Sequence, residues 1–198
     1  MTVMVKICGM TPADDVGAAL EAGADALGFI FAESPRRVTP AQAAKLARDI
    51  PDTVLRVAVM LHPANEEWRA VLDAFRPDVL QTDAADYATL DVPQSLHCWP
   101  VYRQGVSEPG DAPGDFVYEG AKSGKGDVVD WTRAADVART GHMILAGGLG
   151  PANVAEAITR VVPWGVDASS SLERQPGRKD PLAMAAFVSA AKAAERDA

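Results

Sequence analysis

The chain has 198 residues, 48% of them hydrophobic and 23% charged, which is an ordinary globular composition and enough for one substantial domain, residues 1–198. Its 19 basic and 27 acidic residues give a net charge of −8, which argues against nucleic acid as a general partner, because phosphate backbones attract basic surfaces. There is no signal-peptide pattern and no run near the roughly 20 apolar residues of a membrane span, so we expect a cytoplasmic protein without membrane contact.

Along the chain, short apolar runs alternate with amphipathic, alanine-rich segments, which predicts strands alternating with helices. The second helix has Thr39 as its expected N-cap and Pro40 in its first turn. In chain order the predicted units are strand 3–10 and helix 12–23, strand 26–31 and helix 39–50, strand 55–61 and helix 66–75, strand 78–82, strand 96–102, strand 116–120 and helix 130–139, strand 143–149 and helix 151–161, and strand 164–171 and helix 180–196.

Two units lack a full helix. Residues 84–92 favour at most a single helical turn, and the Gly- and Pro-rich segment 103–115 is typical of a loop in place of a fifth helix. Parallel neighbours need crossovers, so eight strands in this alternation predict an α/β fold, a small (β/α)8 TIM barrel with a short fourth helix and no fifth. A doubly wound open sheet is the alternative, but no G-x-G-x-x-G follows the first strand.

In a barrel of this kind, functional residues lie at the carboxyl ends of the strands and in the loops that follow. Gly147 and Gly148 end the seventh strand before a helix, and serines 169–171 follow the eighth. Paired glycines let backbone amides approach an anion, so we expect a phosphate site between these two loops. The alternative is that both segments are only tight turns.

Three further strand ends carry side chains with chemistry. Arg36 and Arg37 suit a carboxylate ligand unless they are merely solvated. Glu119 is a candidate acid, or it forms a plain ion pair with Lys122. Cys8 is a useful base only if something such as a nearby cation lowers its pKa; otherwise it is an unreactive core thiol.

Metal and triad chemistry find no support in the spacing. The two cysteines and three histidines fall in no metal-ligand pattern, and no Ser/His/Asp signature is visible. We therefore expect no metal.

Five runs of the chain, taken together, resemble phosphoribosylanthranilate isomerases of tryptophan biosynthesis. They are spread in the family's order over nearly the whole chain, and they are VKICGMT (5–11), GADALGFIF (23–31), SPRRVTP (34–40), LAGGLGPANV (145–154) and GVDASSSLERQPGRKD (165–180). The resemblance implies an Amadori rearrangement of N-(5'-phosphoribosyl)anthranilate to 1-(o-carboxyphenylamino)-1-deoxyribulose 5-phosphate. It also implies a small phosphosugar substrate and no cofactor, and it leaves open whether the protein is a monomer or a homodimer.

The resemblance implies roles for individual residues. Cys8 is the general base that takes the C2′ proton of a ring-opened Schiff base, and Glu119 is the general acid that protonates the ring oxygen. Arg37 contacts the anthranilate carboxylate, and Asp167 lies near the substrate amine. The phosphate is held by Gly148, Ser169 and Ser170, with Gly147 shaping the loop.

Three residues depart from the family's usual pattern. Glu119 replaces an aspartate and carries the acid one methylene further out. Asp83 replaces a histidine where the substrate's aglycone is expected, which adds a negative charge. Ser171 replaces a glycine, at a local cost of roughly 1 kcal/mol if that position needs positive φ. Two alternatives therefore remain: an aminoaldose-phosphate isomerase with another aglycone, and a catalytically silent phosphosugar-binding barrel.

Overall fold

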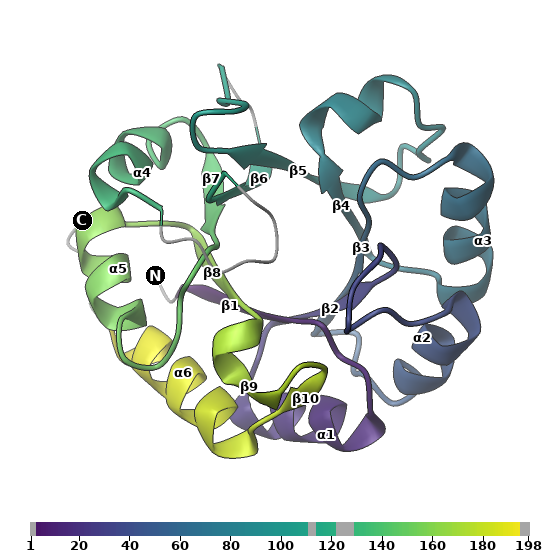
Figure 1. Cartoon of the computed structure of the whole chain (residues 1–198), viewed down its shortest axis with the longest axis horizontal. Coiled ribbons are helices and arrows are strands. Elements are labelled where there is room, and N and C mark those ends of the chain that lie inside the picture. The colour runs from purple at the N-terminus through teal and green to yellow at the C-terminus, as the bar shows by residue number, and fades with distance from the viewer. Residues whose placement is uncertain (1–2, 111–113, 122–128, 195–198) are drawn as a thin grey trace.

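Eight parallel strands close into a barrel in chain order, and the helices lie around its outside (Figure 1). The computed structural model describes residues 3–110, 114–121 and 129–194. The predicted TIM barrel is confirmed. The strands are β1 (Met4–Cys8), β2 (Ala26–Ile30), β3 (Leu55–Val59), β4 (Val79–Asp83), β5 (His97–Arg103), β6 (Asp115–Glu119), β7 (His142–Leu145) and β8 (Gly165–Ala168).

The α-helices follow the predicted units closely. They are α1 (Ala13–Ala22), α2 (Pro40–Leu46), α3 (Asn65–Phe75), α4 (Trp131–Val137), α5 (Val154–Val161) and α6 (Pro181–Ala193). After β4 there is only the 3-10 helix η1 (Ala84–Ala88), as the weak pattern there predicts. Between β5 and β6, the described residues 104–110 and 114 contain no helix. None of the described helices is long and apolar enough to cross a membrane.

The start of α2 illustrates how local sequence sets these boundaries. The Thr39 hydroxyl accepts a hydrogen bond from the Gln42 amide at 3.2 Å, and the Gln42 side chain accepts one from the Thr39 amide at 2.8 Å. This reciprocal capping box satisfies two backbone donors that the helix itself leaves unpaired. The predicted N-cap is therefore confirmed.

Alternation along each strand decides which side chains reach the barrel interior. In β1, Val5 and Ile7 belong to the core between strands and helices, whereas Lys6 and Cys8, on the opposite face, point inward. The apolar side chains of the interior are Ala26, Val57, Val79, Trp99, Val101, Val117, Ile144 and Ala146, and the polar Gln81 and Asp167 are buried with them. Lys6 is thus a charged residue enclosed in the barrel.

A short hairpin after β8 was not expected from the sequence. The 3-10 helix η2 (Ser170–Leu172) is followed by the antiparallel pair β9 (Glu173–Gln175) and β10 (Arg178–Lys179). The hairpin is bound to the start of the chain: the Thr11 hydroxyl donates to the Gly177 carbonyl at 2.5 Å, and the Lys179 amide donates to Asp15 at 2.8 Å. It therefore closes over the junction of β8 and β1.

Candidate active site

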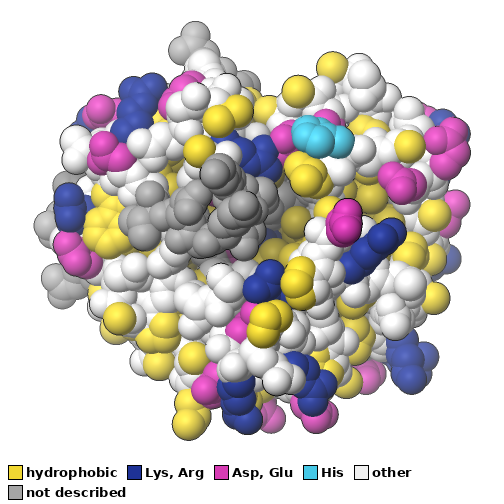
Figure 2. Space-filling view, in the orientation of Figure 1, with side chains coloured by type: hydrophobic (Ala, Val, Ile, Leu, Met, Phe, Trp, Pro, Cys, Tyr) yellow, Lys and Arg dark blue, Asp and Glu magenta, His cyan; other side chains and the backbone are white. Residues whose placement is uncertain are grey.

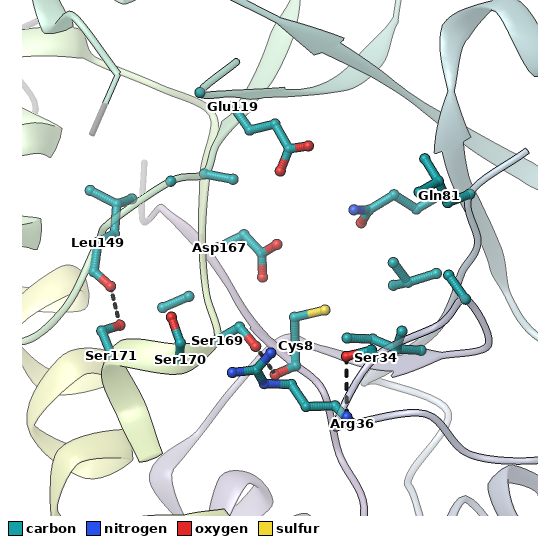
Figure 3. A pocket seen from close by; sticks show the side chains of 18 of the residues that line it. Cys8, Ser34, Arg36, Gln81, Glu119, Leu149, Asp167, Ser169, Ser170 and Ser171 are labelled. Atoms are coloured by element: carbon teal, nitrogen blue, oxygen red, sulfur yellow. Dashed lines mark hydrogen bonds between the residues drawn. The ribbon is translucent and has the colours of Figure 1, made fainter. Parts of the chain in front are cut away.

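One cavity opens at the carboxyl ends of the strands and brings together most of the predicted site residues (Figure 3). Charged side chains of both signs surround this face of the barrel (Figure 2). Seven predicted residues line the cavity: Cys8, Glu119, Gly147, Gly148, Asp167, Ser169 and Ser170. Two predicted residues, Arg37 and Asp83, are not among its lining.

Cys8 lies at the floor of this cavity, with its sulfur directed into the open space (Figure 3). The side chain is 6% exposed. It fits because its neighbour in β2 is Gly28: a Cβ there would lie only 2.8 Å from the Cys8 sulfur. Gly9, which follows Cys8, has φ +86°, a backbone conformation that favours glycine and turns the chain sharply at the strand's end.

Beneath Cys8 lies a buried ion pair. The Lys6 ammonium, fully buried, is 2.7 Å from Asp167 Oδ2. Burial raises the pKa of the Cys8 thiol, and the neighbouring Lys6 charge opposes that effect. The Asp167 charge adds to the rise, and the net direction is upward, so the lowered pKa on which a cysteine base depends is not found in this structure. The Lys6 charge is the strongest influence that favours the thiolate.

Two side chains of the cavity lining each have one buried polar atom that is available to a ligand. Gln81 Oε1 and Asp167 Oδ1 are buried and accept no hydrogen bond from any residue that the structure describes. A buried polar group without a partner costs roughly 1–3 kcal/mol. Since both side chains face the cavity (Figure 3), they are positioned to receive hydrogen bonds from a bound molecule.

On the β8 side, Arg36, Glu173 and Lys179 form what we call the basic cluster. Arg36 donates two parallel hydrogen bonds to Glu173, at 2.6 and 2.8 Å, and Lys179 donates to the same carboxylate at 3.0 Å. Lys179 also donates to the Ser169 carbonyl at 3.0 Å. Burial alone would raise the pKa of Glu173, but the hydrogen bonds from Arg36 and the charge of Lys179 hold it below its ordinary value. The cluster carries a net charge of +1, and Arg36 is its member that lines the cavity.

The two loops expected to hold phosphate are tied to each other. Gly147 and Gly148 have φ of +95° and +64°. The Asn153 side chain donates to the Gly148 carbonyl at 3.0 Å. The Ser171 hydroxyl donates to the Leu149 carbonyl, which joins the loop after β8 to the loop after β7.

The strain expected at Ser171 does not arise. Among the described residues, the non-glycine positions with positive φ are His62, Arg76 and Val162. Ser171 instead lies in the 3-10 helix η2, a conformation open to any residue. The condition on which a cost at Ser171 depended, a positive φ, is therefore not met in this chain.

On the opposite side, Asp83, Arg103 and Glu119 form what we call the acidic cluster. Arg103 Nη1 lies 2.5 Å from Asp83 Oδ1, and Arg103 Nε lies 2.9 Å from Glu119 Oε1. The side chains are 11–16% exposed. Asp83 was expected to meet the substrate, yet its charge is compensated by Arg103. The pairing considered between Glu119 and Lys122 lies outside the described residues.

The adjacent arginines take different directions. Arg36 lines the cavity, whereas Arg37 is exposed and borders a neighbouring hollow, which shares Ala32, Glu33, Met60 and Leu61 with the cavity lining. The expected contact between Arg37 and the anthranilate carboxylate does not fit this placement. Arg36, one residue earlier, is the arginine that can reach a ligand in the cavity.

Several residues of the site were missed by sequence reasoning. Lys6 had a usable signal, since it stands two residues before Cys8 and so shares its face of the strand. Lys179 stands in the PGRKD run, which was noted without a role. Arg103 ends the apolar run of the fifth strand and was assigned to the following loop. Glu173 stands in the same quoted run as Lys179, but its pairing with Arg36, 137 positions away, had no signal in the sequence.

Comparison with known proteins identifies what the chain resembles. The family of N-(5'phosphoribosyl)anthranilate (PRA) isomerases matches residues 5–190. The N-(5'-phosphoribosyl)anthranilate isomerase of Listeria welshimeri is 38% identical over 98% of this chain and 100% of its own length. That of Bordetella petrii is 35% identical over 98% of this chain and 97% of its own.

Solved structures agree with these matches. The crystal structure of TrpF from Jonesia denitrificans is 33% identical with a TM-score of 0.79, covering 96% of this chain and 97% of that one. A phosphoribosyl anthranilate isomerase in complex with reduced 1-(o-carboxyphenylamino)-1-deoxyribulose 5-phosphate is 28% identical with a TM-score of 0.79, covering 96% and 99% of the two chains.

Proposed function

Since the chain belongs to the N-(5'-phosphoribosyl)anthranilate isomerase family, we propose that Cys8 and Glu119 carry out the two proton transfers of its reaction. The protein is an isomerase of tryptophan biosynthesis that acts on N-(5'-phosphoribosyl)anthranilate. The observation that carries the assignment of roles is that a thiol and a carboxylate line the same cavity, together with two glycine- and serine-bearing loops and the guanidinium of Arg36.

Glu119 acts first, as general acid. It gives its proton to the furanose ring oxygen while the bond between C1′ and that oxygen breaks, and the nitrogen lone pair forms the C1′=N bond of a Schiff base. The acid then stands as a carboxylate. Such a positioned proton transfer contributes about 10²–10⁴-fold to rate.

Cys8 acts second, as general base. Its thiolate removes the proton from C2′, and the electron pair forms the C1′=C2′ bond while nitrogen regains its lone pair. The resulting enolamine tautomerises to the ketose. Lys6 supports this step because its charge favours the thiolate, and Asp167 Oδ1 is positioned to accept a hydrogen bond from the substrate amine.

Binding is assigned to the β7 and β8 side of the cavity. The phosphate lies between the loops that contain Gly147 and Gly148 and that contain Ser169 and Ser170, where the Lys179 charge is close. The anthranilate carboxylate meets Arg36 rather than Arg37, because only Arg36 lines the cavity. A planar guanidinium suits a carboxylate well.

The test is turnover of phosphoribosylanthranilate made in situ, followed by loss of its fluorescence. We expect Glu119→Gln and Cys8→Ala each to lower kcat by about 10²–10⁴-fold while the aminoketose product still binds. Arg160→Gln, an exposed helix substitution, serves as the control and is expected to leave kcat unchanged. Near-normal turnover in either site variant removes that residue from the mechanism. Absence of turnover in the unmodified protein, with product still bound, points to a different aglycone or a silent barrel.

A further inference from the structure

Arg103 is placed between the proposed general acid and a second carboxylate, at the ends of three neighbouring strands. It is the last residue of β5, and in the barrel's register it stands directly beside Glu119 of β6. Asp83 is the last residue of β4, on the other side of β5. Each strand therefore contributes one charged side chain to a continuous row.

The contacts within this row are short and largely shielded from water. Arg103 reaches Asp83 at 2.5 Å and Glu119 at 2.9 Å through different nitrogens of one planar group. The Arg103 side chain is only 11% exposed. The contact with Asp83 is a directed hydrogen bond that orients the planar guanidinium, and the contact with Glu119 is an ion pair.

We propose that Arg103, anchored by Asp83, is a positioning residue that holds Glu119 where its proton can reach the ring oxygen. This inference rests on the proposed role of Glu119 as general acid. Arg103 does not line the cavity, so it acts through Glu119 and not on substrate.

The need for such an anchor follows from the length of the acid. A glutamate has one more rotatable bond than the aspartate that the family resemblance leads one to expect, and an unheld carboxylate samples several rotamers. A displacement of about 1 Å at a reacting group lowers the rate by about 100-fold. The Arg103 pair removes that freedom. It also stabilises the carboxylate that Glu119 becomes when it gives up its proton.

Asp83 acquires a purpose in this arrangement. It does not line the cavity, and one of its oxygens is occupied by Arg103. His62 Nε2 lies 3.6 Å from its other oxygen, at a largely exposed position. The negative charge at Asp83 therefore serves to orient Arg103, which in turn faces Glu119.

The experiment measures kcat and KM of Arg103→Gln, with Arg103→Lys alongside and Arg56→Gln as control. Arg56 also pairs with a carboxylate, Asp78, 2.7 Å away at the opposite end of the barrel, but it binds that one carboxylate through two nitrogens. We expect kcat of Arg103→Gln to fall by about 10–100-fold with KM changed less than about threefold. Arg103→Lys, which keeps the charge but reaches one carboxylate, should retain more kcat than Arg103→Gln. Arg56→Gln should leave both constants unchanged.

A double-substitution cycle separates positioning from mere support of the fold. In a Glu119→Gln background, Arg103→Gln should lower kcat by less than about twofold, because the group it positions is already gone. The same loss in both backgrounds overturns the proposal, as does a rise in KM with unchanged kcat. If Arg103→Gln does not fold, Arg103→Lys carries the same cycle. Normal kcat in Glu119→Gln itself refutes the proposed role of Glu119, which is a different outcome from normal kcat in Arg103→Gln.

Discussion

The two sides of the cavity hold charge in opposite arrangements. In the basic cluster, one carboxylate, Glu173, lies between two cations; in the acidic cluster, one cation, Arg103, lies between two carboxylates. The first carries a net charge of +1. The second carries −1 when Glu119 is a carboxylate and none when Glu119 holds the proton that it donates in the proposed mechanism. Under the proposed assignment, the phosphate and the carboxylate of the substrate lie beside the first cluster, while the second holds the proposed proton-transfer group near the sugar ring.

The largest loss of stability is expected when the carboxylate of the basic cluster is removed. Glu173→Gln leaves the buried Lys179 and the mostly buried Arg36 without their counter-ion, so we expect the free energy of unfolding at pH 7 to fall by about 3–5 kcal/mol. Urea unfolding of the variant and the unmodified protein measures this. Glu156→Gln, on the exposed face of α5, is the control and should change it by less than about 0.5 kcal/mol.

The difference in unfolding free energy between Glu173→Gln and the unmodified protein should become smaller as pH falls. The pKa of Glu173 is held below its ordinary value, so its contribution is complete above the unfolded value of about 4.3 and is lost as pH falls through the lower folded value. The two unfolding free energies should therefore converge as pH is lowered below about 4. A difference that stays constant down to acid pH would show that Glu173 stabilises by packing alone.

The next largest effect should separate the adjacent arginines. Arg36→Ala removes a guanidinium from the cavity wall, and a hydrogen bond to a charged group is worth about 1.5–3 kcal/mol, so KM should rise by about 10–100-fold. Arg37→Ala is the matched control and should leave KM within about twofold, because its side chain is exposed outside the cavity. Initial rates measured over a range of substrate concentrations give the KM of both variants. A larger effect from Arg37 would reverse the assignment.

A smaller effect tests the link between the phosphate loops. Ser171→Gly removes the hydrogen bond to the Leu149 carbonyl, which at about 0.5–1.5 kcal/mol should weaken product binding by about 2–10-fold. Isothermal titration with the aminoketose product measures the change. Ser171→Ala, which lacks the hydroxyl but not the Cβ, should behave alike. Unchanged affinity in both variants would mean that the loops hold their positions without this bond.

The smallest effect is expected at Asp83. Asp83→Asn keeps an oxygen that accepts from Arg103 while removing the charge, so kcat should fall by only about threefold and KM should stay the same. A large drop in KM would instead mean that the Asp83 charge repels the substrate. In that case Arg103 does not neutralise the Asp83 charge, and the acidic cluster does not have the proposed role.

Much of the fold could be predicted because its signals are local. Thr39 and Pro40 predict the start of α2, and the apolar runs predict the strands to within a few residues. Parallel strands then bring their carboxyl ends together, so Cys8 and Glu119 were expected at one mouth without any knowledge of contacts.

The missed parts depend on pairs that are distant in sequence. Arg36 and Arg37 are adjacent residues of the same type, so the sequence does not distinguish them. The turn in which they lie decides which of them reaches the cavity. Glu173 lies 137 positions from Arg36, its main partner. Arg103 was assigned to a loop, although one more residue of β5 places it beside Glu119. Such pairings arise from closure of the barrel, which no local pattern encodes.

The hairpin that follows β8 also constrains when the site can form during folding. Its contacts with Thr11 and Asp15 join positions 166 and 164 apart along the chain. Contacts between such distant residues form late, because the intervening chain must first be ordered. A nascent chain that lacks residues from 173 onward possesses all eight strands but neither Glu173 nor Lys179. The basic cluster is therefore completed only by residues 173–198, so a product of translation that stops before them has the thiol, the acid and both phosphate loops but leaves Arg36 without the carboxylate that orients it.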